Sequence, residues 1–363
     1  MSNQTTHLSR IVVNIKPVDP QWIKNAAERT SLLVMPPRAL GRLHDVSEMI
    51  CAIQQTLSPD IGRKAFLVMA GDHGVVSEGV SAFPQEVTGE MIKTFLSGGA
   101  GINVLAGQVD AGVFVVDMGI KPELDLAAIG ENNRLIVRKV AAGTENLSIG
   151  PAMTREQAET SIITGFDIAT GLFESGIQVL GTGDMGIGNT TPSAAIGAVI
   201  TGCRLADMVG PGTGIDEQGL NRKMDVIQRG IDVNRPDAGD GLDVLAKVGG
   251  FEIGGIAGCI LAGAYHGFPV VIDGFISTAG ALVAHAITPD VTDYIFAGHC
   301  SEEPGHRLML NHLGLKPILD LGMRLGEGTG GALAMGIMDG AVRIFNDMAT
   351  FEEAGVSEKK SQV

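Results

Sequence analysis

Six short apolar runs, each ending abruptly in glycine and polar residues, constrain the fold of this chain more than any other feature. Runs that are apolar at consecutive positions are typical of strands buried on both faces, as in parallel sheets. Helix-length segments, such as residues 155–174 and 217–231, separate the runs. The pattern therefore predicts an α/β fold with an open parallel sheet flanked by helices. The runs are residues 65–70, 113–117, 177–180, 269–273, 294–297 and 318–321.

The first sixty residues lack this pattern and show helical periodicity over residues 21–33 and 44–56. We expect residues 1–60 to form a small helical accessory domain together with a C-terminal helix over 331–356. Residues 61–330 then form the large α/β catalytic domain. The most apolar stretch, 253–284, is interrupted by a histidine, a proline and an aspartate. It predicts a buried helix, a strand and a second helix, and no membrane span.

Charge and cysteine usage exclude several classes of partner. A formal net charge of -15 opposes binding to nucleic acid, which depends on Lys and Arg neutralising phosphates. The four cysteines are far apart and form no CxxC pair, and the polar start MSNQTTHLSR carries no secretory signal. These features predict a cytoplasmic protein with reduced thiols and no nucleic-acid partner.

The polar loops are expected to form one composite site. In open α/β sheets ligands bind outside the carboxyl ends of the strands, where this chain concentrates Gly, Asp, Glu, His, Ser and Thr. The chain contains 51 glycines, clustered at these junctions. Such clustering indicates backbone brought close to a ligand.

The richest of these loops is GTGDMGIGNTTP, residues 181–192. It contains a formal GxGxxG at Gly181, Gly183 and Gly186, which leaves a dinucleotide-binding oxidoreductase as an alternative. Four further residues separate this pattern from the next helix, however. We expect that helix to begin with Thr191 as N-cap and Pro192 at the first helical position, with free N–H groups that can bind phosphate or ribose. A plain glycine-rich turn is the other interpretation.

A second glycine loop, GPGTGID at 210–216, precedes a helix that carries Lys223. This lysine could reach a phosphate as a point charge, or could be a solvated lysine on a helix face. The spacing favours neither interpretation.

Two loops offer side chains whose roles are ambiguous. In GDHGVVSEGVSAFPQEVT, residues 71–88, Phe83 and Gln85 could provide an aromatic face and an amide for a planar heterocycle, or could simply pack the loop. The Asp-His pair of this loop lacks further metal ligands at suitable spacing. In GHCSEEPGHRLML, residues 298–310, Cys300 has no activating constellation, and Ser301 and Glu302 are better candidates for ligand contacts.

The string RLGEGTGGALAM places a single carboxylate, Glu327, between glycines just before an apolar helix. A Glu at a helix start can be only a favourable partner of the helix dipole. Flanking glycines also leave the carboxylate free to face a cleft, where burial raises a carboxyl pKa toward the range of a general base. Both interpretations remain open from the residues alone.

Taken in order along nearly the whole chain, these strings resemble the nicotinate-nucleotide:dimethylbenzimidazole phosphoribosyltransferase family of cobalamin nucleotide-loop assembly. The strings are MPPRALGRL, GDHGV…SAFPQEVT, DMGIGNTT, GPGTGID, GHCSEEPGH and RLGEGTGGALAM. The resemblance implies a Rossmann-like sheet with a small helical domain, and a homodimer with its site near the subunit interface. It also implies transfer of the 5-phosphoribosyl group of nicotinate mononucleotide to a benzimidazole-type base, with neither metal nor cofactor.

The resemblance also assigns residue roles. Glu327 is expected to be the catalytic base, which suits a reaction whose leaving group departs as a neutral pyridine while the attacking base must lose a proton. The family usually has Glu where this chain has Asp184, so the reach of that carboxylate is one methylene shorter. The expected nucleotide and phosphate contacts are Asp184, Gly186, Gly188, Asn189, Thr190, Lys223 and Ser301, and the expected acceptor-base contacts are Phe83, Gln85 and Leu325.

Two rivals complete the set of hypotheses. A pyrophosphate-sugar transferase could use PVVIDGFISTAG, but that type of loop needs paired acids and magnesium, and Asp273 stands alone. A non-catalytic ligand-binding protein is the other rival.

Overall fold

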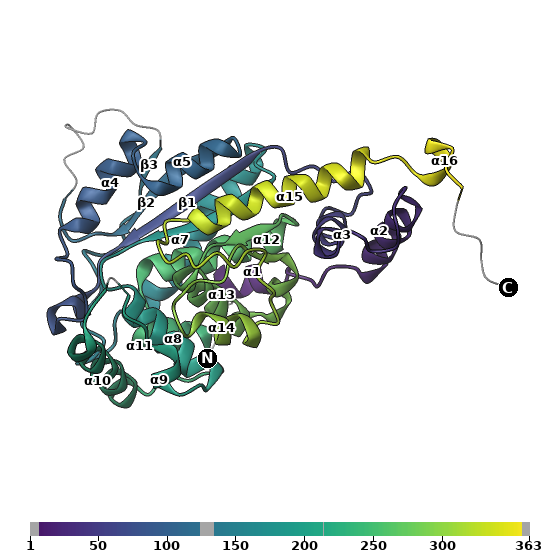
Figure 1. Ribbon diagram of the computed structural model, residues 1–363. Coiled ribbons are helices and arrows are strands. Elements are labelled where there is room, and N and C mark those ends of the chain that lie inside the picture. Colours follow the sequence, from purple (N-terminus) through teal and green to yellow (C-terminus); the bar gives the residue numbers. More distant parts are fainter. Residues whose placement is uncertain (1–6, 124–133, 213, 358–363) are drawn as a thin grey trace.

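A six-stranded sheet forms the centre of the protein, seen in a computed structural model that describes residues 7–123, 134–212 and 214–357 (Figure 1). All strand pairs are parallel, in the order β3-β2-β1-β4-β5-β6. This arrangement confirms the predicted open parallel α/β sheet. The strands are β1 (Lys64–Gly71), β2 (Ala111–Gly119), β3 (Leu135–Val137), β4 (Val179–Met185), β5 (Val270–Ile272) and β6 (Ile295–Ala297).

Five of the six apolar runs overlap strands of the sheet. The prediction of a strand at the sixth run was wrong. Residues 318–321 form no strand, and Leu319 makes only an isolated parallel bridge with His299. The run follows the polar loop after β6 and lies beside the end of that strand, where the Ile318 N–H donates to the Ala297 carbonyl at 2.8 Å. Strand β3 was missed because it is three residues long and only partly buried at the sheet edge.

Helices cover both faces of the sheet (Figure 1). Helices α12 and α13 pack on one face, with α7 behind α12, whereas α5 and α15 contact strands on the other face. The longer helices are α7 (Arg155–Glu174), α8 (Thr190–Thr201), α10 (Glu217–Asn234), α12 (Phe251–His266), α13 (Phe275–Ile287) and α15 (Thr329–Asp347). The shorter ones are α4 (Val87–Ser97), α5 (Gly101–Gln108), α9 (Leu205–Met208), α11 (Gly241–Val248) and α14 (His306–His312), with 3-10 turns η1 (Gly74–Glu78) and η2 (Pro289–Tyr294).

The expected helix, strand and helix over 253–284 are α12, β5 and α13. Among the described residues no helix is both long and apolar enough to cross a membrane. One predicted helix start was wrong, because α8 begins at Thr190 with Asn189 in the cap position, so Thr191 and Pro192 already lie in its first turn.

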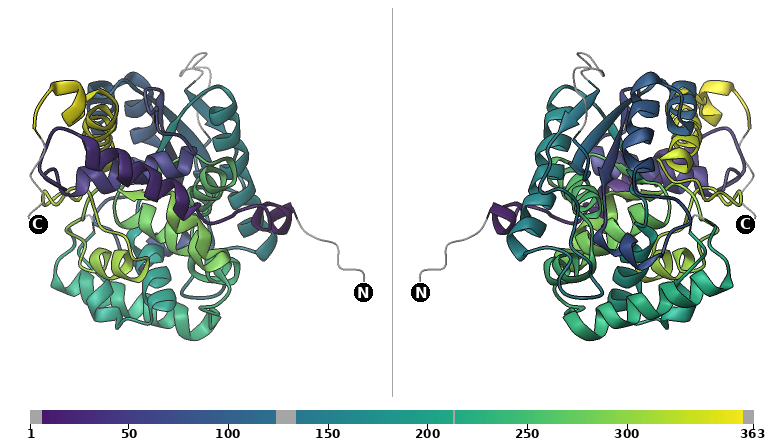
Figure 2. Two further views of the ribbon diagram at one scale, coloured as in Figure 1. Left: turned by 90° about the vertical axis from the view of Figure 1, so that its right-hand side faces the viewer. Right: turned by 90° about the vertical axis from the view of Figure 1, so that its left-hand side faces the viewer.

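The N-terminal helices separate into two groups. Helices α2 (Pro20–Leu32) and α3 (Arg42–Gln54) pack on each other, and α15 contacts α3, whereas α1 (His7–Val12) contacts α12 and α7. Figure 2 shows α1 on the side of the molecule away from the C-terminus. The expected helix over 331–356 is interrupted after Asp347, and α16 (Phe351–Ala354) follows separately. The division into two domains stays a prediction.

Glycines allow two buried helices to approach each other closely. A Cβ atom on Gly165 of α7 would lie 2.0 Å from the Gly255 carbonyl oxygen of α12, and a Cβ on Gly258 would lie 2.0 Å from the Ile162 oxygen. Both distances are far below van der Waals contact. Part of the glycine content thus serves packing, away from any ligand loop.

A second close approach positions the loops at the edge of the sheet. Gly183 lies within β4, and a Cβ atom there would be 2.0 Å from the backbone oxygen of Glu327. The turn before α15 therefore rests directly on the backbone of β4. Because all strands are parallel, this turn and the loops after β1, β4, β5 and β6 meet at one edge.

We expect Gly183→Ala to lower the free energy of unfolding by about 1–3 kcal/mol, because the added methyl group must displace the backbone of the turn. Gly171 of α7 has open space around its Cβ position and serves as the matched control. Gly171→Ala is expected to stabilise the protein by about 0.5–1 kcal/mol, since alanine favours a helix interior. Urea unfolding of both variants measures the difference, and equal effects would contradict the role of Gly183.

Candidate active site

A cavity of about 240 Å³ opens where the predicted loops converge. It combines residues that follow β4, β5 and β6 with the segment that precedes α15. Of the residues expected to bind substrate, it brings together Asp184, Asn189, Thr190, Ser301 and Leu325. The other lining residues are Gly212, Gly274, Phe275, Ile276, His299, Glu303, Arg324 and Gly326.

Asp184 is a buried carboxyl group at the end of β4, on the cavity wall. The Asn189 side-chain amide donates to its Oδ2 at 2.9 Å. Burial, together with the negative charge of Asp273, raises the pKa of Asp184 to about 8. At neutral pH this side chain therefore carries a proton for most of the time and can donate a hydrogen bond into the cavity.

Glu327 is buried and does not itself line the cavity, although its neighbours Leu325 and Gly326 do. Its Oε2 accepts the N–H of Ile102 at 3.0 Å, at the start of α5, where the helix dipole favours a negative charge. Burial raises the pKa of Glu327 above its usual range, and the Ile102 N–H opposes this shift. The carboxylate is thus held in a fixed place with increased basicity, as a general base requires.

Lys223 is fully buried beneath the GPGTGID loop, which excludes the interpretation as a solvated lysine. Its Nζ donates to Thr190 Oγ1 at 2.8 Å and to the Gly210 carbonyl at 3.2 Å. Burial lowers the pKa of Lys223 to about 8, while the Glu303 carboxylate favours its charged form. The ammonium group therefore lies behind Thr190, at the start of α8, where backbone N–H groups also favour an anion.

Gly186 and Gly188 do not line the cavity. A Cβ atom on Gly186 would lie 2.3 Å from the Gly71 carbonyl, and one on Gly188, at φ +87°, would lie 2.6 Å from Val76. These two glycines pack the loop after β4 against the loop after β1. Any contribution to phosphate binding comes through the position of the residues that follow them.

The three expected acceptor-base residues lie in different surroundings. Leu325 is on the cavity wall and 62% exposed, whereas Phe83 lies outside that wall and is 52% exposed. Gln85 donates from its side-chain amide to the His73 carbonyl at 3.1 Å. The roles of Phe83, Gln85 and Leu325 stay predictions.

Three polar residues in or next to the cavity were not singled out from the sequence as site residues. Asp273 and His299 are fully buried, and the distance from His299 Nε2 to Asp273 Oδ1 is 3.5 Å. Glu303 lines the cavity beside Lys223, and burial raises the pKa of its carboxyl group. Asp273 ends an apolar run and Glu303 lies in GHCSEEPGH, so position at a strand end was the signal available for both.

The expectation that Cys300 is not a nucleophile agrees with its surroundings. Its side chain is buried, and burial raises the pKa of the thiol, which disfavours the reactive thiolate. His306 accepts the Ser301 N–H at its Nδ1 at 2.8 Å and contacts Thr278 Oγ1 through Nε2. Burial lowers the pKa of His306 to about 3, so this imidazole is neutral and supports the loop.

A separate buried cluster lies behind the loop after β1, where His73 Nε2 is 2.9 Å from Glu252 Oε1. Within the described ranges, no group of three or more His, Cys, Asp and Glu side chains is arranged to hold a metal ion.

The parallel sheet and the cavity at the carboxyl ends of its strands define an α/β protein with the ligand-site position typical of open α/β sheets. Comparison with known proteins makes the class specific. Residues 15–356 match the model of a phosphoribosyltransferase family, and the chain belongs to that family.

Two curated relatives extend over nearly the whole chain. Nicotinate-nucleotide--dimethylbenzimidazole phosphoribosyltransferase from Geobacter sulfurreducens is 52% identical over 97% of this chain and 99% of its own length. The protein of the same name from Desulforamulus reducens is 53% identical over 97% of this chain and 99% of its own length. A crystal structure of the Thermus thermophilus enzyme of that name has a TM-score of 0.88 and 47% identity, covering 94% of this chain and all of that one.

The family assignment removes the dinucleotide alternative, and the geometry gives the reason. Gly181 and Gly183 lie inside strand β4 and not in a turn between strand and helix. A Cβ atom on Gly181 would meet the Phe66 ring at 2.1 Å, so this glycine makes room for a core side chain. The GxGxxG spacing is therefore a coincidence of packing requirements.

The raised pKa of Asp184 predicts a pH-dependent stability. Because its pKa in the folded protein, about 8, exceeds the usual 3.8, folding takes up a proton between these values. The free energy of unfolding therefore falls as pH rises through this window, by at most ~1.4 kcal/mol per pH unit from this group. We expect Asp184→Asn to remove this loss, as measured by urea unfolding between about pH 5 and pH 8. Parallel pH dependence in the variant and the wild-type protein would contradict the assignment.

Proposed function

We propose that this protein transfers the 5-phosphoribosyl group of nicotinate mononucleotide to dimethylbenzimidazole or a related base, giving the α-ribotide and nicotinate for cobalamin assembly. The observation that carries the proposal is the buried Glu327 carboxylate next to Gly326 of the cavity wall, with the buried Asp184 carboxyl group on that same wall. The activity named for two relatives that are more than half identical to this chain supports it.

The chemistry requires one base. The lone pair of an acceptor ring nitrogen forms a bond to the anomeric carbon of the ribose, and the bond from that carbon to the pyridinium nitrogen breaks. Nicotinate leaves with this electron pair as a neutral pyridine, so it needs no general acid. The acceptor ring becomes cationic and loses its other N–H proton to Glu327, whose raised pKa suits this transfer. Attack opposite the leaving group inverts the anomeric carbon.

The phosphate and ribose are assigned to the side of the cavity near α8. Lys223 provides a cation behind Thr190, at the N-terminus of α8, where the helix dipole also favours an anion. Asp184 and Asn189 are hydrogen-bonded to each other and face the same cavity, where a protonated carboxyl group can bind a ribose oxygen. Ser301 lies on the same wall, and Gly186 and Gly188 hold the loop in place.

The acceptor base is assigned to the mouth of the cavity. Leu325 is exposed there, and its Cδ2 lies 2.8 Å from the position that a Cβ atom on Gly101 would take. An apolar wall of this kind can cover one face of a planar heterocycle. Phe83 and Gln85 would complete the acceptor site from the loop after β1.

A homodimer in the cytoplasm is part of the same proposal. Leu325 is exposed beside Gly101, and Val104, one turn further along α5, is 68% exposed. Exposed apolar groups next to a binding site mark an interface more often than they mark a free surface. The reduced state of the four cysteines expected from their spacing suits the cytoplasm.

Sedimentation velocity of the purified protein is expected to give a mass about twice the 37.7 kDa of one chain. Val104→Glu should shift it toward the monomer, because a charge at a buried apolar contact is unfavourable. A monomeric wild-type protein would contradict the homodimer.

Incubation of the wild-type protein with nicotinate mononucleotide and a panel of benzimidazoles, purines and phenols tests the activity. We expect release of nicotinate together with a ribotide whose mass identifies the accepted base. Glu327→Gln should lower kcat by a factor of ~10²–10⁴, since the amide has the shape of the carboxylate but accepts no proton.

Binding of nicotinate mononucleotide to Glu327→Gln, measured by calorimetry, should remain close to that of the wild-type protein. This control separates loss of the base from loss of the site. No nicotinate release with any base would refute the proposed function, and full activity of Asp184→Ala would remove the role given to the second carboxyl group.

A further inference from the structure

The turn that carries Glu327 has an unusual backbone. Gly326, Glu327 and Gly328 have φ values of +81°, +64° and +105°, so three successive residues are in the left-handed region. Glycine adopts this conformation readily, but a glutamate there is strained by on the order of 1 kcal/mol. Surrounding contacts must hold Glu327 in this conformation.

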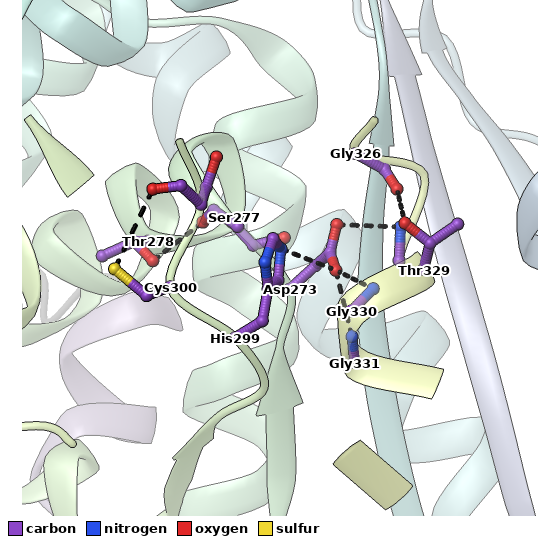
Figure 3. Close-up of polar contacts among 12 residues, drawn as sticks. Asp273, Ser277, Thr278, His299, Cys300, Gly326, Thr329, Gly330 and Gly331 are labelled. Carbon is purple, nitrogen blue, oxygen red and sulfur yellow. Dashed lines mark hydrogen bonds and ion pairs between the residues drawn. The ribbon is translucent and has the colours of Figure 1, made fainter. Parts of the chain in front are cut away.

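One carboxylate, that of Asp273, binds the end of this turn and the start of the helix that follows it. Asp273 Oδ2 accepts the N–H of Gly328 at 3.1 Å, and its Oδ1 accepts those of Gly330 at 2.7 Å and Gly331 at 3.0 Å. Figure 3 shows this carboxylate pointing at the first turn of α15, between His299 and the glycine backbone. Asp273 thus connects the end of β5 to the last residue of the turn and to the first turn of α15.

Two further features keep Asp273 in this position. Its side chain is fully buried, and His299 Nε2 lies 3.5 Å from Oδ1. A Cβ atom on Gly330 would lie 2.0 Å from His299 Cδ2, so the imidazole fills the space beside the glycine backbone. Asp273 itself is not part of the cavity wall, although the next residue, Gly274, is.

We propose that Asp273 is a positioning residue for the phosphoribosyl transfer, whose carboxylate holds the Gly326–Gly328 turn so that Glu327 faces the acceptor. It contacts no substrate and acts through Glu327. The proposal rests on the proposed function, because it gives Glu327 the role of base. Thr329 supports the same turn through its hydroxyl, which donates to the Gly326 carbonyl at 2.8 Å (Figure 3).

The charge of Asp273 distinguishes a positioning role from that of an ordinary helix cap. Burial raises the pKa of Asp273 itself, whereas His299 and the three backbone N–H groups favour its charged form. In that form it raises the pKa of both Glu327 and Asp184, in each case in addition to burial. A helix cap far from the site would affect stability alone. Removal of this charge should therefore lower the pKa of Glu327, and the acid limb of the kcat profile should move to lower pH.

Asp273→Asn tests the proposal in the full-length protein with nicotinate mononucleotide and dimethylbenzimidazole. An amide of the same size places an NH₂ group against the backbone donors and removes the charge. We expect kcat to fall at least ~10-fold, the KM for nicotinate mononucleotide to change less than ~3-fold, and the acid limb to move down by ~0.5 pH unit or more.

Asp117→Asn is the matched control. Asp117 is a buried carboxylate near the end of β2 that accepts the N–H groups of Gly119 at 3.0 Å and Ile120 at 2.9 Å. It therefore binds backbone N–H groups as Asp273 does, but away from Glu327. Its variant should lose stability but keep the pH profile of kcat. An unchanged kcat in folded Asp273→Asn, or an unchanged acid limb, would overturn the proposal.

If Asp273→Asn does not fold, Thr329→Val loosens the same turn without changing any charge. A lower kcat with an unmoved acid limb would support the positioning of Glu327 by this turn, and an unchanged kcat would overturn it. Wild-type and Glu327→Gln proteins, assayed in parallel, separate failure of the proposed function from failure of the role given to Asp273. If the wild-type protein is active and Glu327→Gln is not, the proposed function stands whatever the result for Asp273.

Discussion

The contact on which the candidate site depends is the close approach of the turn before α15 to the end of β4. Gly183 has no side chain, so the Glu327 carbonyl can lie where a Cβ atom would otherwise be. Asp273, just after β5, accepts one N–H group of the same turn and two from the first turn of α15. Two neighbouring strands of the sheet thus fix one short turn. Because the sheet is rigid, the Glu327 carboxylate on this turn has a fixed position, which effective base catalysis needs.

The electrostatics of the site differ between its two sides. Asp184, Asp273 and Glu327 are buried close together, and the negative charge of Asp273 adds to burial in raising the pKa values of the other two. Near α8, by contrast, Lys223 and the helix N-terminus favour a phosphate, even though the chain carries a net charge of -15. A transfer in which positive charge develops on ribose and acceptor, while the phosphate stays anionic, matches this separation. For a phosphate at this position, the nearby lysine and helix N-terminus therefore matter more than the net charge of the whole chain.

The sequence predicted the sheet well because buried parallel strands leave a direct record of consecutive apolar residues followed by glycine. It failed at residues 318–321, whose apolar side chains lie along the end of β6 without forming a strand, and at β3, a short and partly exposed edge. Glu327, Lys223 and the loop after β4 were recognisable as motifs. Asp273 was considered only as part of a pyrophosphate-sugar loop and was set aside because it has no neighbouring acid. Its partners are backbone N–H groups that begin at Gly328, 55 residues further along the chain. Spacing along the chain carries no signal for such a contact.

Several features of the site are costly to the folded state. Glu327 has a left-handed backbone, Lys223 is a buried ammonium, and Asp184 holds a proton against its ordinary tendency. The rest of the fold must offset these terms, and the close packing of α7 on α12 through Gly165 and Gly258 is one place where it does so. The glycine-rich composition therefore has two origins: residues such as Gly183 and Gly326 admit the strained site, and residues in the helices build the dense frame that holds it.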